Sequence, residues 1–179
     1  SLEIYSLPNS PVATNEVACV GGVIPDLVSL GTNSTWYTDA ALTNVVGTNS
    51  SFATGQTAAG VYTYYVTETN ANGCESAATT VTLTINSFNT LPIASNVNIC
   101  FGTPVPDLTV VGIGTSFTWY SDPALTTIVG LNSPFTTGQT APGLYTYYVT
   151  ETQNGCQSPA TTVTLEIYNL PNTGPINHW

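Results

Sequence analysis

The chain contains one sequence pattern twice, and this repeat limits what it can fold into. The stretch YTYYVTETNANGC begins at Tyr62 and returns as YTYYVTETQNGC at Tyr145. The match continues on both sides, because ACVGGVIPDL corresponds to ICFGTPVPDL and SAATTVTLTI to SPATTVTLEI. A repeat of this length is a copied structural unit, so the sequence predicts two small domains, residues 7–87 and residues 88–169.

The two ends of the chain also repeat each other. LEIYSLPN begins at Leu2 and returns almost unchanged as LEIYNLPN at Leu165. Residues 1–6 are therefore predicted to be either the last strand of a preceding repeat or a donor strand, and residues 170–179 a linker or the start of a next repeat. In the first case the chain is a fragment of a longer array, which is the preferred interpretation. In the second, Leu2 and Ile4 pair with the sheet of a neighbouring subunit.

Apolar and polar residues alternate in the repeated segments. From Tyr62 onward one parity carries Tyr62, Tyr64 and Val66, while the other is rich in Thr. Such alternation predicts strands with one buried face, and turn residues at intervals of about 8–12 residues indicate an antiparallel sandwich. The expected strands of the first copy lie near residues 17–20, 26–30, 35–38, 45–46, 51–54, 60–69 and 78–85, with counterparts in the second copy.

Four aromatic residues are predicted to lie in the structural core. Trp36 and Trp119 stand in equivalent TWY segments, and a large ring in the middle of such a module is typical of a sandwich core. Tyr62 and Tyr145 each follow a glycine and one apolar residue. This arrangement resembles a tyrosine corner, in which the phenol bonds back to upstream backbone.

Other tyrosines permit a different interpretation. If Tyr37, Tyr65, Tyr120 and Tyr148 point away from the core, they form an exposed aromatic platform that could stack against sugars. Glycan binding is therefore the alternative to a purely structural role.

The charge of the chain excludes several partners. It has ten acidic residues, no Lys or Arg and a formal net charge of −10. Nucleic acids are excluded because Lys and Arg hold their phosphates, and no apolar run of about 20 residues predicts membrane insertion. The acids are scattered and His178 has no motif partner, so we expect no enzyme and no resident metal or other cofactor, with calcium between repeats as the alternative.

The cysteines fall two in each copy. Cys19 and Cys74 belong to the first copy, and Cys100 and Cys156 to the second. Their even distribution predicts one disulfide within each domain and an oxidising compartment, with free buried thiols as the alternative. A zinc site is not expected, because the chain has no CxxC motif.

Taken in order, the segments C-x-G, WY, TYYV and GC-x-S resemble the immunoglobulin-like repeats of large secreted, adhesin-type cell-surface proteins of the Bacteroidota. The resemblance covers both copies. It implies an all-β fold of two tandem immunoglobulin-like antiparallel β-sandwich modules, and an extracellular or cell-surface location. The chain differs from such repeats in having no basic residue, which argues against binding to anionic polymers.

These observations favour a non-enzymatic structural module. The predicted role is a spacer or building block of an extracellular adhesin or filament, whose partners are other copies of the repeat. End-to-end assembly by strand exchange is the alternative to a longer covalent array. Surface glycans are the partners in the alternative interpretation.

Overall fold

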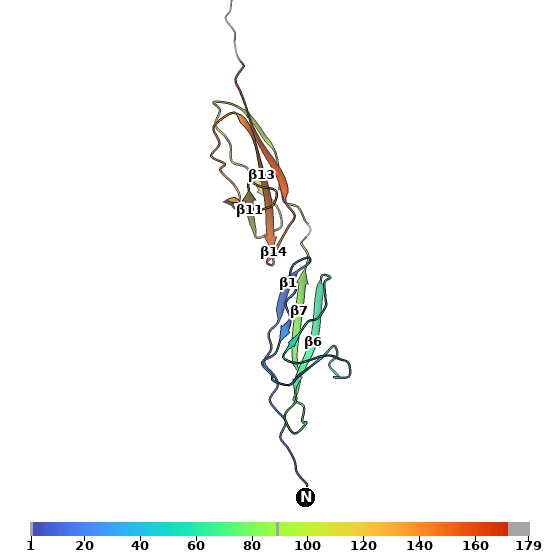
Figure 1. Cartoon of the computed structure of the whole chain (residues 1–179). Coiled ribbons are helices and arrows are strands. Elements are labelled where there is room, and N and C mark those ends of the chain that lie inside the picture. Colours follow the sequence, from blue (N-terminus) through green and yellow to red (C-terminus); the bar gives the residue numbers. More distant parts are fainter. Residues whose placement is uncertain (1, 89, 172–179) are drawn as a thin grey trace, which may run out of the picture. The chain divides into compact units, whose positions relative to one another are not determined.

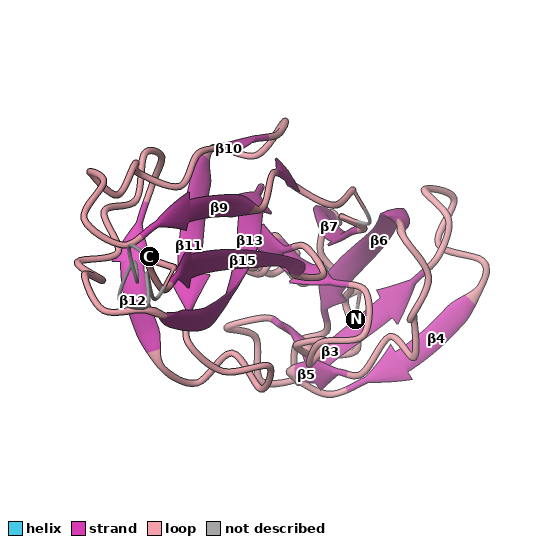
Figure 2. Cartoon of the chain, turned by 90° about the horizontal axis from the view of Figure 1, so that it is seen from above, coloured by secondary structure: helices cyan, strands magenta, loops and turns pink. Residues whose placement is uncertain are grey.

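The computed structural model describes residues 2–88 and 90–171, and the chain divides into two compact units, Ser1–Ser87 and Phe88–Trp179 (Figure 1). Module 1 and module 2 denote these units. Every regular element of the described residues is a strand (Figure 2), and none of these residues form a helix long and apolar enough to cross a membrane. Most of the predicted linker or next-repeat segment, 170–179, lies outside the described residues, as does His178.

Module 1 is a sandwich of a five-stranded sheet and a two-stranded sheet. The larger sheet has the strand order β1-β7-β6-β3-β4, and β2 pairs with β5 in the smaller one. The strand pairings are antiparallel, except that β1 and β7 are parallel. The strands are β1 (Glu16–Cys19), β2 (Leu27–Val28), β3 (Ser34–Tyr37), β4 (Val45–Thr48), β5 (Ser51–Phe52), β6 (Gly60–Glu68) and β7 (Thr79–Asn86).

Module 2 repeats this architecture. Its larger sheet has the order β12-β11-β13-β15-β9, with the short β14 beside β13, and β8 pairs with β10. The first and last strands of the larger sheet, β9 and β15, are again parallel. The strands are β8 (Ile93–Ala94), β9 (Val97–Cys100), β10 (Val110–Val111), β11 (Ser116–Tyr120), β12 (Ile128–Leu131), β13 (Gly143–Gln153), β14 (Cys156–Gln157) and β15 (Thr161–Tyr168).

Each module buries one face of its larger sheet around a tryptophan. Trp36 is fully buried, stacks on Phe52 with ring centroids 5.6 Å apart, and donates its indole N–H to the carbonyl oxygen of Asn49 at 2.9 Å. Alternate residues of β6 and β7 complete the core, because successive strand residues point to opposite faces. The core residues are Leu27, Trp36, Tyr64, Val66, Val81, Leu83 and Ile85 in module 1, and Leu108, Val110, Trp119, Phe135, Tyr147, Val149, Val163, Leu165 and Ile167 in module 2. The all-β sandwich fold predicted from the sequence is confirmed.

The opposite face of the sheet is less exposed than the alternation predicts. The chain folds back after β6, where Thr69 forms a bridge with Glu75, and the N–H of Ser76 bonds to the carbonyl of Glu68 at 2.9 Å. Thr67, on the expected polar face, is consequently buried. The hairpin between β6 and β7 thus covers part of the face that sequence alternation assigns to solvent.

Candidate functional site

The two cysteines of module 1 lie at opposite ends of its sheet. Cys19 is the last residue of β1 and is the register partner of Asn86, the last residue of β7. Cys74 lies in the turn between β6 and β7, before β7 begins at Thr79. Eight residues of strand span roughly 23 Å from the first Cα to the last. We call the end that carries Cys74 the hairpin end and the end that carries Cys19 the exit end.

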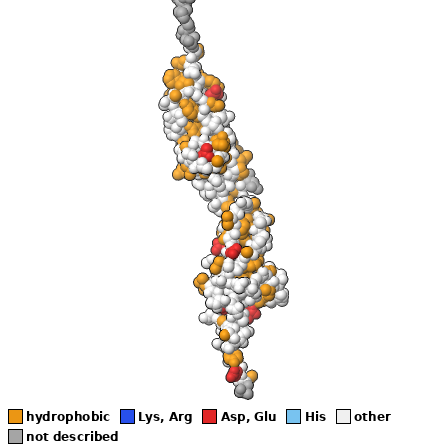
Figure 3. Space-filling model, viewed as in Figure 1, with side chains coloured by type: hydrophobic (Ala, Val, Ile, Leu, Met, Phe, Trp, Pro, Cys, Tyr) orange, Lys and Arg blue, Asp and Glu red, His pale blue; other side chains and the backbone are white. Residues whose placement is uncertain are grey.

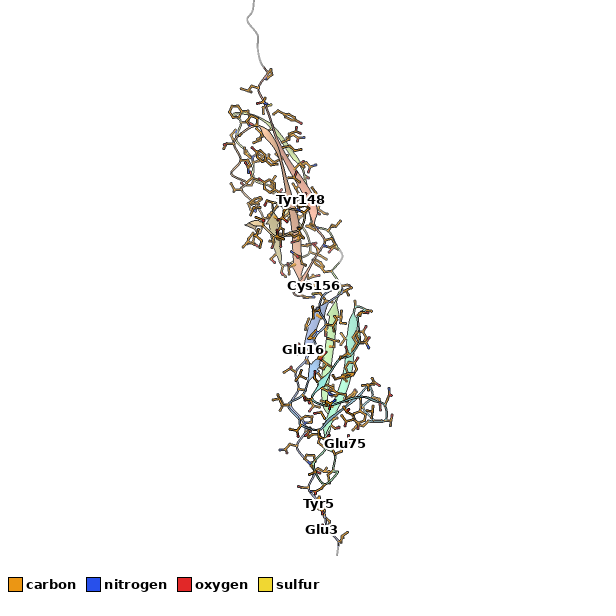
Figure 4. All side chains as sticks on the ribbon, viewed as in Figure 1. Glu3, Tyr5, Glu16, Glu75, Tyr148 and Cys156 are labelled. Carbon is orange, nitrogen blue, oxygen red and sulfur yellow. The ribbon has the colours of Figure 1, made fainter. Side chains whose placement is uncertain are left out.

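Module 2 has the same arrangement. Cys100 ends β9 and is the register partner of Tyr168, the last residue of β15, so it lies at the exit end. Cys156 begins β14 at the hairpin end, where Figure 4 shows it at the tip of the β13–β15 hairpin. Each module therefore has one cysteine at each end.

The predicted disulfides within the modules are wrong. A disulfide requires Cα atoms about 4.4–6.8 Å apart, and a full strand separates Cys19 from Cys74 and Cys100 from Cys156. In the structure Cys74 and Cys100 are free thiols, and the disulfide-bonded cysteines are Cys19 and Cys156. The prediction failed because it rested only on the distribution of the cysteines along the chain, whereas the parallel pairing of the first and last strands places the first cysteine of each module at the end of the sheet opposite the hairpin.

The chain reaches each module at the hairpin end. The hydroxyl of Thr79, the first residue of β7, donates to the carbonyl of Pro11, and Thr161 bonds to Pro92 in the same way in module 2. The side-chain amide of Asn70, in the hairpin of module 1, donates to the carbonyl of Ser6 at 3.1 Å. The chain thus enters each module at the hairpin end, beside Cys74 or Cys156, and leaves it at the exit end, beside Cys19 or Cys100.

The N-terminal segment lies outside the sheets. Leu2 and Ile4 are 89% and 87% exposed and belong to no strand. In β15 the equivalent residues, Leu165 and Ile167, are core residues. The segment therefore exposes Leu2 and Ile4, whose counterparts are buried in the last strand of module 2.

The four tyrosines predicted as a glycan platform do not form one. Tyr37 and Tyr120 are only 6% exposed, and Tyr65 and Tyr148 are half-buried. The phenol of Tyr37 donates to Glu75 at 2.7 Å, beneath the hairpin. The interpretation failed because the hairpin folds back over the face on which these rings lie.

Tyr62 and Tyr145 hold the beginning of the longest strands. Each is half-buried against the core and donates its hydroxyl at 3.0 Å to a carbonyl four residues upstream, Ala58 in module 1 and Ala141 in module 2. This is the geometry of a tyrosine corner. Its role is to fix the loop before β6 and β13.

Two carboxylates anchor the loop before the tryptophan strand. Glu68 accepts bonds from the backbone N–H groups of Thr32 and Asn33, both at 3.0 Å. Burial acts to raise the pKa of Glu68, but these hydrogen bonds outweigh it and lower the pKa. Glu151 is fully buried, and its Oε2 atom accepts from the N–H of Gly114 at 2.7 Å. Both glutamates stand at the same place in the repeated TET segment, but nothing in that local pattern predicts this role.

The remaining acids do not assemble into a site. Figure 3 shows acidic side chains as separate spots on the visible face. Among the described residues, no three His, Cys, Asp or Glu side chains come together in a way that could hold a metal ion.

A cavity of about 550 Å³ lies at the exit end of module 2. It is lined by Phe101–Val105, Thr136–Thr140 and Ile167, none of which is ionisable. Its counterpart in module 1 measures about 270 Å³ and lies beside Ile24–Asp26. Neither lining carries an arrangement of groups suited to catalysis.

Comparison with solved structures identifies proteins of similar fold. The fibronectin(III)-like modules of CbhA from Clostridium thermocellum match with a TM-score of 0.50 and 14% identity, over 94% of this chain and 100% of theirs. Extracellular domains 3–5 of Drosophila OTK match at 0.42 and 16%, over 88% and 61%. The BSP domain of a biofilm associated protein matches at 0.30 and 15%, over 93% and 30%. At 14% identity the CbhA match shows the fold alone. A comparison with curated proteins finds no match.

Comparison with family models gives a more specific result. The model described as "Ig-like domain CHU_C associated" matches residues 8–86 and again residues 90–168, and no enzyme family is found. Ig-like domains are generally non-catalytic. With both of its modules matched, the chain belongs to the family of Ig-like domains associated with CHU_C.

Proposed function

We propose that the chain is a structural repeat module of an extracellular adhesin or filament, and that copies join end to end by strand exchange. Membership of an Ig-like family typical of bacterial surface proteins supports the extracellular location. Two self-contained cores, one in each module, suit a spacer or building block. Length is gained by copying a unit that buries its own core.

The observation that carries the end-to-end assembly is the exposed N-terminal copy of a core strand. Leu2–Tyr5 has the same sequence, LEIY, as Leu165–Tyr168 of β15. The phenol of Tyr5 bonds to Glu3, and that of Tyr168 bonds to Glu166 two residues upstream in β15. The N-terminal segment therefore has the side chains, and a local contact, of a strand that belongs in a sheet.

Strand exchange also conserves the apolar burial of the receiving module. Full burial of an exposed apolar side chain contributes about 1.5–3 kcal/mol, so the free energy gained by burying Leu2 and Ile4 offsets that lost by displacing Leu165 and Ile167. The segment can replace Leu165–Tyr168 of a neighbouring copy at the same register, because the four residues are identical. The core of the receiving module then keeps its packing.

The test is electron microscopy of the full chain and of matched variants. The unsubstituted chain should form fibres with a regular repeat. The double variant Leu2→Asp, Ile4→Asp should give only short particles, because two charged side chains would enter the receiving core. Leu7→Asp is the matched control, since Leu7 is 69% exposed and its counterpart in the second LEIY copy, Leu170, is also exposed at 61%. Fibres from the double variant, or isolated rods from the unsubstituted chain, would contradict strand exchange.

A further inference from the structure

The two free thiols differ from their repeat equivalents in bonding state. Cys74 stands at the hairpin end of module 1, as Cys156 does in module 2. Cys100 stands at the exit end of module 2, as Cys19 does in module 1. Cys156 and Cys19 are disulfide-bonded, whereas Cys74 and Cys100 are free. The same structural position therefore forms a disulfide in one module and offers an open thiol in the other.

One free cysteine lies at an exit end and the other lies at a hairpin end. The two disulfide-bonded cysteines are distributed in the same way. In a head-to-tail row, the exit end of module 2 of one copy meets the hairpin end of module 1 of the next. Cys100 and Cys74 are the cysteines at those two ends.

We propose that Cys100 of one copy forms an intermolecular disulfide with Cys74 of the next, so that the fibre is covalently linked along its length. The inference rests on the proposed end-to-end assembly and specifies a bond that this assembly does not require. The partner is a second copy of this chain, because every copy carries one free cysteine at an exit end and one at a hairpin end.

Neither free cysteine is buried, which permits this chemistry. Cys100 is exposed and Cys74 is half-buried in the hairpin turn, where its backbone N–H donates to the side-chain oxygen of Asn70 at 3.0 Å. Each thiol loses one proton as the sulfur–sulfur bond forms, and the pair gives up two electrons. A disulfide oxidant takes up the two electrons and two protons and leaves as two thiols. An extracellular setting supplies such conditions and preserves the product.

The experiment uses the full chain with a low-molecular-weight disulfide as oxidant. The unsubstituted chain should give a ladder of multimers on a non-reducing gel, and a reducing agent should collapse the ladder to the monomer. On the same gel, run under denaturing conditions that separate strand contacts, Cys74→Ser alone and Cys100→Ser alone should each migrate as a monomer, because each retains only one kind of free thiol. An equal mixture of the two variants should give a dimer and nothing larger. Mass spectrometry of chymotryptic fragments should find Cys74 joined to Cys100.

The outcomes separate this inference from the proposed function. Fibres of normal length in the microscope without the ladder would overturn the disulfide and leave strand exchange intact. Dimers formed by either variant alone would overturn the complementary pairing, because they require a bond between identical cysteines. The two serine variants should still form fibres, in which the strand contacts alone hold the copies together.

Discussion

Residue 75 follows the hairpin cysteine in module 1, and residue 157 follows it in module 2. Glu75 accepts bonds from the hydroxyls of Thr67 at 2.6 Å and Tyr37 at 2.7 Å, and these bonds lower the pKa of Glu75. Burial and the bond to Glu75 raise the pKa of Tyr37. Gln157 makes the corresponding contacts in module 2, with its amide donating to Tyr120 at 2.7 Å. A carboxylate in module 1 and an amide in module 2 thus occupy equivalent positions and bond to equivalent tyrosines.

This difference predicts that the modules respond differently to acid. A carboxyl group with a lowered pKa stabilises the folded state above its unfolded pKa, near the ordinary value of 4.5. That stabilisation is lost as pH falls through the folded pKa. Glu75→Gln should therefore reduce the loss of Tm between pH 6 and pH 3, while the converse change Gln157→Glu should increase it. Thermal unfolding at several pH values measures both, and equal slopes in all three proteins would contradict the role of residue 75.

At the scale of the element, β4 and β12 each contain a glycine at which there is no room for a side chain. A Cβ atom on Gly130 of β12 would lie 2.3 Å from a ring carbon of Phe135, and one on Gly47 of β4 would lie 2.7 Å from a ring carbon of Phe52. Both phenylalanines are held by neighbouring rings. Phe135 is stacked on Trp119 and meets Tyr147 edge to face, and Phe52 makes the same contacts with Trp36 and Tyr64. Each glycine therefore allows the neighbouring phenylalanine to pack against the tryptophan of its module.

Gly130→Ala should accordingly destabilise module 2. Overpacking of a well-packed core costs about 1–3 kcal/mol, and we expect Gly130→Ala to fall in that range and Gly47→Ala to cost less, in proportion to its longer contact. Chemical denaturation of the full chain gives the free energy of unfolding for both. An unchanged midpoint for Gly130→Ala would show that Phe135 can be displaced without loss.

The sequence predicts the strands and their buried faces better than it predicts which cysteines form disulfides. Alternation along Tyr62–Val66 identifies the buried face, because a strand residue and its second neighbour share one side of the sheet. Which strands pair is a long-range property, and the parallel partnership of β1 with β7 leaves no trace in local periodicity. The burial of Tyr37 likewise depends on a hairpin that folds back from a distant part of the chain. The positions of the disulfides and the loss of the tyrosine platform follow from these two features.

At the scale of the whole molecule, charge opposes the proposed assembly. The net charge is −10, and the chain has no Lys or Arg to form ion pairs between copies. Contacts between copies must therefore come from apolar burial, backbone hydrogen bonds and the proposed disulfide. Long-range repulsion between acidic copies slows their approach.

Added salt should consequently accelerate assembly. Raising ionic strength from about 10 mM to about 150 mM shortens the Debye length from about 30 Å to about 8 Å, which screens the repulsion between copies. Light scattering by the full chain should rise faster at the higher ionic strength, and sodium chloride and potassium chloride should act alike. A slower rise with added salt would mean that attractive charge contacts drive the association.

The parallel pairing of first and last strands has a consequence for a module under tension. A pull on the two ends of module 1 draws β1 toward the hairpin end and β7 toward the exit end. The four register pairs from Glu16↔Leu83 to Cys19↔Asn86 are then loaded together in shear, rather than opened one after another. Rupture requires several backbone hydrogen bonds to break at once, and β9 with β15 repeats the arrangement in module 2. Each sandwich therefore contains a mechanical clamp along the line of the chain, which is consistent with the proposed structural role.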